Sequence, residues 1–323
     1  MTEKPPAGLV IGKFMPPHAG HLHLFALAKQ KVASLHIILF SKSNEPIPGS
    51  LRETWLRELA PGAVIHHVNL EHAVDFADPA AWDFWEGAIR SVLPRAPDLV
   101  FSSEPYGDEL ARRLGTRHWP VDPSRAQVPI SAAQIRALPM EHWDHIPPPV
   151  RPYFVRRVAI VGAESTGKTT LAQAVAAHFR TVRVPEFARD YLLARDGQCT
   201  EADIPIIAAG QVRLEDELAR EADRLLVCDT DLLTTQLWHE HYFGPCPPEL
   251  LQLSKERAAH LYLLCDLDVP WVADGLRDSP RQRRWFHRRF LEELERRGSA
   301  FRLVSGSRER RLEIAIAGLE ELL

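Results

Sequence analysis

Residues 157–170, RVAIVGAESTGKTT, decide the fold of the second half of this chain. The apolar run Val158–Val161 predicts a buried strand, and the residues from Thr169 onward (TTLAQAVAAHF) have helical spacing. Between them, residues 162–169 match GxxxxGK[ST], a loop whose glycines let backbone N–H groups turn inward around a triphosphate. The alternative is a chance glycine-rich turn, but the strand, the spacing and the helix all favour a phosphate-binding loop.

The polar groups of this P-loop have expected tasks. Lys168 would reach the outer phosphates of ATP and act catalytically, and the Thr169 hydroxyl would ligate Mg²⁺. The expected ATP contacts of the loop are Gly162, Glu164, Ser165, Thr166, Gly167, Lys168, Thr169 and Thr170.

Acidic residues follow two predicted strands of the same half. Asp229 and Asp231 end the run RLLVCDTD, where Asp229 would complete the Mg²⁺ shell and Asp231 would contact the substrate. Glu186 follows TVRV as the candidate base for an acceptor hydroxyl, with Arg189 beside it as a substrate contact. The alternatives are strand-end turns for the aspartates and a surface ion pair for Glu186 and Arg189.

Residues 274–284, DGLRDSPRQRR, are punctuated by Gly and Pro and rich in arginine. A lid that closes over phosphates would have this composition, which makes Arg277 and Arg281 candidate ATP contacts. Without the P-loop upstream, a solvated basic helix start would be the better interpretation.

The first half contains a second phosphate-binding candidate, residues 12–21, GKFMPPHAGH, between the strand LVIG and a helix. His18 and His21 lie three residues apart at the helix start. They could be metal ligands, core histidines or phosphate contacts. No third ligand stands at matching spacing, and a helix N-terminus near Gly20 favours an anion. We therefore favour phosphate contacts.

This decapeptide resembles the GxFxPxHxGH signature of the nucleotidyltransferase superfamily, in which the two histidines hold the phosphates of ATP. Residues 130–136, ISAAQIR, are similar to its ISxTxxR-type motif, although Ala133 replaces a hydroxyl and Gln134 a commonly basic residue. We expect weaker ATP binding there, unless Lys13 or an arginine between Arg112 and Arg125 fills the gap. The ATP contacts that the resemblance implies are Gly12, Lys13, Phe14, His18, His21, Ser131 and Arg136.

A nucleotidyltransferase followed by a P-loop kinase resembles the bifunctional nicotinamide-mononucleotide adenylyltransferase and ribosylnicotinamide kinase family of the NadR type. The resemblance spans nearly the whole chain and rests on GKFMPPHAGH, SSEPYGDELA, VPISAAQIR, YFVRRVAIVGAESTGKTTLA, VPEFARDY, DTDLLTTQLW and DGLRD. It implies that the second domain phosphorylates nicotinamide riboside with ATP and that the first converts the mononucleotide and ATP to NAD and pyrophosphate. Some relatives carry an N-terminal helix-turn-helix domain, but only eleven residues precede Gly12, so DNA repression is not expected.

The positively charged nicotinamide ring would favour an aromatic face. Trp82 and Trp85 are the substrate candidates in the first half and Trp238 in the second. Core packing is the alternative for each, because aromatic residues at helical spacing usually pack.

Composition limits the class of protein. The 323 residues are 45% hydrophobic and 25% charged, typical of globular chains, and a formal charge of −4 gives no bulk attraction to nucleic acid or membrane. No membrane span or signal peptide is evident, and the four cysteines form no CxxC pair, so we expect a cytoplasmic protein with reduced thiols. The oligomeric state stays open, a homo-oligomer included.

Length predicts about two domains of roughly 150 residues. Pro147, Pro148, Pro149 and Pro152 interrupt regular structure between two series of alternating strands and helices. We expect two doubly wound parallel α/β domains: a Rossmann-like nucleotidyltransferase over residues 1–146 and a P-loop kinase over 157–323, with a linker over 147–156. Competing functions are a kinase of another small nucleoside with a weak first domain, and a nucleotide-sensing regulatory ATPase.

Overall fold

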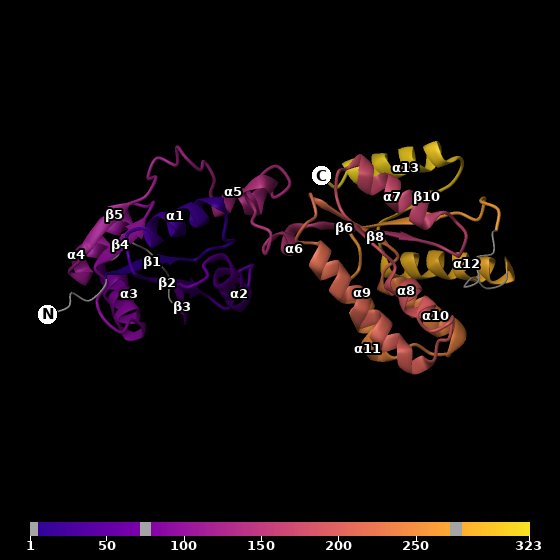
Figure 1. Cartoon of the computed structure of the whole chain (residues 1–323), viewed down its shortest axis with the longest axis horizontal. Coiled ribbons are helices and arrows are strands. Elements are labelled where there is room, and N and C mark those ends of the chain that lie inside the picture. Colours follow the sequence, from indigo (N-terminus) through magenta and orange to yellow (C-terminus); the bar gives the residue numbers. More distant parts are fainter. Residues whose placement is uncertain (1–5, 72–78, 272–279) are drawn as a thin grey trace. The chain divides into compact units, whose positions relative to one another are not determined.

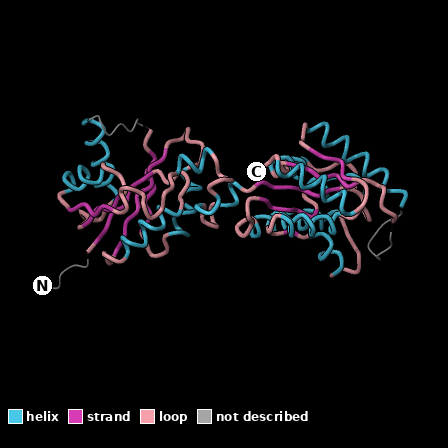
Figure 2. Tube along the Cα trace, turned by 90° about the horizontal axis from the view of Figure 1, so that it is seen from above, coloured by secondary structure: helices cyan, strands magenta, loops and turns pink. Residues whose placement is uncertain are grey.

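The computed structural model describes residues 6–71, 79–271 and 280–323. The chain divides into two compact units, Met1–Val150 and Arg151–Leu323 (Figure 1). Each unit contains one five-stranded parallel sheet with helices against both faces (Figure 2). The predicted fold class, two doubly wound α/β units, is confirmed. No helix within the described ranges is long and apolar enough to cross a bilayer.

The sheet of the first unit has the strand order β3-β2-β1-β4-β5. Its strands are β1 (Ala7–Gly12), β2 (Ser34–Ser41), β3 (Val64–Asn69), β4 (Leu99–Ser102) and β5 (Arg117–Pro120). Its helices are α1 (Ala19–Lys29), α2 (Gly49–Leu59), α3 (Pro79–Val92), α4 (Tyr106–Leu114) and α5 (Ala132–Ala137), with a 3-10 turn at Trp143–His145.

Alternate residues of β1 enter two different cores. Val10 packs with Phe25 of α1 and Leu56 of α2 on one face. Leu9 packs with Ile89 of α3 and Leu110 of α4 on the other. Burial on both faces explains why the central strands read as continuous apolar runs.

The sheet of the second unit has the order β10-β9-β6-β8-β7. Its strands are β6 (Arg156–Val161), β7 (Arg183–Val184), β8 (Leu225–Asp229), β9 (Leu261–Cys265) and β10 (Phe301–Val304). Its helices are α6 (Arg151–Phe154), α7 (Lys168–His178), α8 (Phe187–Leu193), α9 (Ile204–Leu218), α10 (Leu232–Tyr242), α11 (Pro248–Glu256), α12 (Pro280–Arg297) and α13 (Arg308–Glu320), with a 3-10 turn at Glu201–Asp203. Ile160 of β6 faces α7 and α13, and Val161 faces α10 and α12.

The segment 147–156 is more structured than a plain linker. It contains α6 and the first residue of β6, and Val150 and Val155 are buried. The domain limits of 1–146 and 157–323 stay a prediction, which a fragment can test.

Candidate active sites

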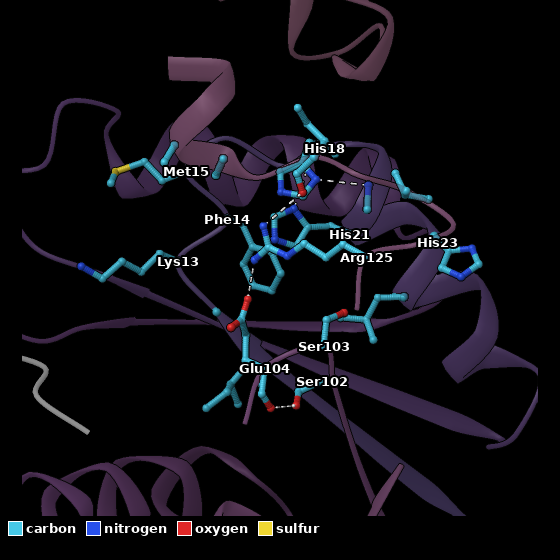
Figure 3. Close-up of a pocket in the computed structure, with 18 of the residues that line it drawn as sticks. Lys13, Phe14, Met15, His18, His21, His23, Ser102, Ser103, Glu104 and Arg125 are labelled. Atoms are coloured by element: carbon cyan, nitrogen blue, oxygen red, sulfur yellow. Dashed lines mark hydrogen bonds and ion pairs between the residues drawn. The ribbon is translucent and has the colours of Figure 1, made fainter. Parts of the chain in front are cut away.

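The cavity of the first unit, about 480 Å³, lies at the carboxyl ends of β1 and β4. Here the strand order reverses, because β2 lies on one side of β1 and β4 on the other, and ligands of open α/β sheets bind at such points. Figure 3 shows the loop after β1 around this cavity. The expected ATP contacts that line it are Gly12, Lys13, Phe14, His18, His21 and Arg136.

His18 and His21 form the start of α1. His18 is the N-cap, and its Nδ1 accepts the backbone N–H of Gly20 at 3.1 Å. Nδ1 of His21 accepts the N–H of His18 at 3.2 Å, and the two rings lie 3.8 Å apart between centroids. Since both Nδ1 atoms accept hydrogen bonds, each neutral ring carries its proton on Nε2.

Both histidines are neutral at physiological pH. Burial lowers the pKa of His18 to about 4, and the positive charges of Arg125 and His145 contribute. Burial, His18 and Arg125 lower the pKa of His21 well below its ordinary value. The helix start therefore offers two imidazole N–H donors and no fixed charge to an entering phosphate.

Lys13 is held beside the cavity by an ion pair, with its Nζ 3.1 Å from Oε1 of Glu45. Glu45 also pairs with Arg52, which is fully buried and donates to the backbone oxygen of Lys13 at 2.6 Å. Arg52 thus anchors the loop after β1. No sequence pattern marks this role, because Arg52 lies 39 residues beyond the Lys13 backbone oxygen that it holds.

The residues of the motif at α5 have different positions relative to the cavity. Ser131 caps the helix and exchanges hydrogen bonds with Gln134, at 2.8 Å between Oγ and Oε1. Ser131 and Gln134 do not line the cavity, whereas Ala133 and Arg136 do. Arg136 donates to the backbone oxygen of Met15.

The two tryptophan candidates of the first unit differ in their position relative to the cavity. Trp85 lines the cavity and packs against Phe40, 4.0 Å between ring centroids. Trp82 does not line it but is buried among α3 and α4, with the Arg113 guanidinium 5.6 Å from its ring centroid. Only Trp85 is in position to contact a ligand in this cavity.

Two Ser-His-acid sets support the two opposite edges of this sheet. Ser102, which ends β4, lies 3.0 Å from Nε2 of His118 in β5, whose Nδ1 lies 2.8 Å from Oδ1 of Asp108 in α4. The serine is only 1% exposed, so the set fastens α4 to the sheet rather than offering a nucleophile.

The second set repeats this arrangement at the opposite edge of the sheet, between β2 and β3. Ser41, which ends β2, lies 2.7 Å from Nε2 of His67 in β3, and Nδ1 of that ring lies 2.9 Å from Oε2 of Glu53 in α2. A glycine begins or nearly begins each of the two helices. A Cβ atom on Gly49 would lie 2.5 Å from Nε2 of His67, and one on Gly107 would lie 2.2 Å from Nε2 of His118.

The cavity of the second unit, about 190 Å³, surrounds the P-loop. The loop turns tightly at Gly162, which has a φ of 140°. A Cβ atom added there would lie 2.9 Å from the carbonyl oxygen of Cys265, so this position has no room for a side chain. Lys168 donates to the backbone oxygen of Ala163 at 3.0 Å. All eight P-loop residues expected to contact ATP line the cavity, from Gly162 and Glu164 to Thr170.

Arg311 braces the P-loop from behind. This buried side chain of α13 donates to the backbone oxygen of Thr166 at 2.9 Å and pairs with Asp268. No sequence pattern marks this role, because Arg311 lies 145 residues beyond the loop that it holds.

Glu186 and Arg189 line the same cavity at the start of α8. Burial raises the pKa of the Glu186 carboxyl; Lys168 opposes this rise and Asp229 adds to it. Together with Lys168 and Asp229, Glu186 forms a charged group at the carboxyl edge of the sheet.

Asp229 ends β8, and its Oδ2 lies 3.3 Å from Nη1 of Arg183. Its buried Oδ1 has no hydrogen-bond partner among the described residues. A carboxylate oxygen of this kind and the Thr169 hydroxyl, which lines the cavity, are ligands that suit Mg²⁺. The residues present therefore fit the expected metal.

Asp231 does not lie on the wall of the cavity, where a substrate contact would have to be. It caps α10, accepts the N–H of Leu233 at 3.1 Å and the hydroxyl of Tyr262 at 3.0 Å, and does not line the cavity. Burial raises its pKa to about 7. The turn interpretation describes its position better than substrate contact does.

Trp238 lines the cavity and packs against Phe286, 6.0 Å between ring centroids. Thr234, one turn earlier on α10, also lines it, and its buried hydroxyl has no partner within the described ranges. Of the lid candidates, Arg277 lies outside the described residues, and Arg281 belongs to the first turn of α12.

Comparisons with known proteins agree with this geometry. A family model described as an AAA domain matches residues 157–311. The trifunctional NAD biosynthesis/regulator protein NadR of Escherichia coli (strain K12) is 34% identical over 326 residues, which cover 93% of this chain and 78% of the relative. NadR of Salmonella typhimurium (strain LT2) is 33% identical over 320 residues, 91% of this chain and 77% of the relative.

Two solved structures have the same fold. A NadR protein in complex with NR has a TM-score of 0.81 at 22% identity and covers 98% of this chain and 95% of its own. A NadR protein in complex with NAD and AMP-PNP has a TM-score of 0.78 at 21% identity and covers 98% of this chain and 96% of its own.

Proposed function

The chain belongs to the NadR family of NAD biosynthesis proteins, and on this premise we propose how its residues divide the work between the two cavities. It is a bifunctional enzyme: it phosphorylates nicotinamide riboside with ATP, and it adenylylates nicotinamide mononucleotide to NAD. What remains to be assigned is the role of each side chain.

We assign riboside phosphorylation to the second unit. The 5′ oxygen of the riboside would attack the γ-phosphorus of ATP, the bridging oxygen would leave with ADP, and Glu186 would take the hydroxyl proton. A buried carboxylate with a raised pKa is a stronger base than an exposed one. Lys168 and the backbone N–H groups of the P-loop would hold the transferring charge.

Thr169 and Asp229 would hold Mg²⁺, which, when bound, neutralises charge on the phosphate oxygens. Trp238 would contact the nicotinamide ring, and Arg189 would contact the substrate from α8. The position of Thr169, Arg189 and Trp238 on the cavity wall supports these roles, and for Asp229 the support is its unpartnered Oδ1 at the end of β8.

We assign adenylyl transfer to the first unit. A phosphate oxygen of the mononucleotide would attack the α-phosphorus of ATP, and the bond to the leaving pyrophosphate would break. The nucleophile is already an anion, so no general base is needed. The neutral Nε2–H donors of His18 and His21 suit this reaction, because they stabilise the phosphates by hydrogen bonding.

The paired histidines at the start of α1 are the observation that carries the assignment of the first unit. The test gives the purified full chain nicotinamide riboside, ATP and Mg²⁺ and identifies the products by mass. The native chain should form NAD, whereas His21→Ala should stop at the mononucleotide. NAD formation by His21→Ala at the native rate would remove the adenylyl transfer site from this cavity.

A further inference from the structure

The loop after β5 is built to present one arginine. The Asp122 carboxylate accepts three successive backbone N–H groups, from Ala126, Gln127 and Val128, at 2.8 to 3.1 Å. The N–H of Arg125 donates to the Asp122 carbonyl at 2.9 Å, and Arg125 has a φ of 53°. A left-handed conformation at a residue with a long side chain is uncommon and needs such a framework.

The side chain of Arg125 enters the adenylyltransferase cavity, where Figure 3 shows it beside His18 and His21. Its Nη2 lies 2.6 Å from Oε1 of Glu104 in the loop after β4. The guanidinium is close enough to both histidines to lower their pKa values. Arg125 therefore shares the space that the phosphates of ATP would occupy.

The carboxylate partner of Lys13 is held more firmly than the partner of Arg125. Lys13 is paired with Glu45, and that carboxylate is itself held by the buried Arg52. Lys13 and Arg125 are about equally exposed, at 44% and 41%, but Glu45 is 7% exposed whereas Glu104 is 47% exposed. Exposed ion pairs are weak, so exchange of Glu104 for a multiply charged phosphate is favourable.

The motif at α5 leaves a gap in charge on the same side of the cavity. Ala132 and Ala133 line it without a side-chain donor, and Gln134 is turned toward Ser131. These three residues thus bring no positive charge to this part of the cavity.

We propose that Arg125 fills this gap: when ATP enters, Arg125 leaves Glu104 and binds the two phosphates that depart as pyrophosphate, and Glu104 holds the guanidinium in place before that. The proposal rests on the proposed adenylyl transfer in the first unit. It makes Arg125 a catalytic residue that touches the leaving group, and Glu104 a positioning residue.

The test measures NAD formation and the reverse reaction, in which NAD and pyrophosphate give the mononucleotide and ATP. Arg125→Ala should raise KM for ATP and for pyrophosphate by about 10- to 100-fold, as expected for a lost charged contact, and leave KM for the mononucleotide and for NAD within about 2-fold. Arg125→Lys should recover part of the loss, because it restores charge without the bidentate geometry. Glu104→Gln should lower KM for ATP, since the competing carboxylate is gone.

Arg112→Ala is the matched control. Arg112 also pairs with a glutamate, Glu109, at 2.6 Å, but it does not line the cavity, so this variant should keep native constants. Riboside phosphorylation by each variant reports whether the chain is intact, because the P-loop lies in the other unit.

Three results would overturn the proposal for Arg125. Unchanged KM values for ATP and pyrophosphate in Arg125→Ala would exclude the contact. A rise confined to the mononucleotide would place Arg125 on the other substrate. A parallel loss in Arg125→Ala and Arg125→Lys, without a difference between substrates, would indicate a structural role. A native chain that forms no NAD would instead refute the adenylyl transfer on which the proposal rests.

Discussion

Lys168 is poised on its own loop. Its amine donates to the carbonyl of Ala163 and is free to turn toward a phosphate when ATP binds. We expect Lys168→Ala to reduce riboside phosphorylation by at least about 10²-fold, because the charge on the transferring phosphoryl group loses its counterion. Conversion of the mononucleotide to NAD should stay at the native rate.

Coupled assays of ADP release and NAD formation measure both activities on one preparation. Lys255→Ala, on the exposed surface of α11, is the control for loss of a lysine. Near-native kinase turnover in Lys168→Ala, or loss of both activities in a folded variant, would contradict the assignment.

The proposed role of Glu186 predicts an effect on kinase kcat and on the pH dependence of the kinase rate. Glu186→Gln keeps the shape and removes the base, so kinase kcat should fall by about 10²-fold while ATP still binds. A base must be ionised, and burial raises the pKa of Glu186. The kinase rate of the native chain should therefore fall, as pH is lowered, at a higher pH than an ordinary carboxyl would cause, and Glu186→Gln should lack this limb. An unchanged kcat would leave Glu186 a positioning role at most.

Single positions also show what sequence could and could not predict. The P-loop and the GKFMPPHAGH motif are contiguous, so their residues could be named in advance. Arg52 and Arg311 hold loops that fold against them from distant positions, and an isolated arginine carries no local pattern. Arg125 falls in the stretch expected to supply a replacement charge, but no motif distinguishes it from the other arginines there. Asp231 illustrates the opposite failure: its spacing from Asp229 suggested a site, but its side chain caps a helix.

Apolar runs predict strands such as β1, β6 and β8, whereas β5 carries no such signal. Arg117–Pro120, RHWP, is mostly exposed, has no alternation and contains proline, so nothing in its sequence predicts a strand. It forms at the edge of the sheet because β4 offers it hydrogen bonds and His118 joins the Ser102 set.

Gly107 tests how closely α4 must approach that edge. A methyl group there would lie 2.4 Å from Oγ of Ser102 and 2.2 Å from Nε2 of His118. Gly107→Ala should destabilise the first unit by about 1–3 kcal/mol, the usual cost of overpacking, and weaken adenylyl transfer through the neighbouring Glu104 loop. Gly87→Ala, on α3 where a Cβ meets nothing within 4 Å, should be neutral or slightly stabilising.

Thermal unfolding of the full chain, followed together with kinase activity, distinguishes these outcomes. The kinase should be unaffected by either glycine substitution. Equal melting of Gly107→Ala and Gly87→Ala would show that α4 can move away from the sheet at little cost.

At the scale of the molecule, the protein combines two units that each have their own sheet and core. A fragment that begins at Pro148 keeps Val150, Val155 and all of β6, and we expect it to fold and to phosphorylate the riboside with kinetic constants near those of the full chain. Circular dichroism and the kinase assay check this. An insoluble or inactive fragment would mean that residues 1–147 contribute to the folding of the kinase.

The paired Ser-His-acid sets have a consequence for how this family can vary in evolution. At each sheet edge the glycine leaves room for the imidazole, and the imidazole occupies the space that the missing Cβ leaves. Loss of the histidine would relax the demand for glycine, whereas a side chain at the glycine position would expel the histidine. Positions 102, 107 and 118 should therefore co-vary among homologues as one group and positions 41, 49 and 67 as another, and each edge of the sheet can drift independently of the other.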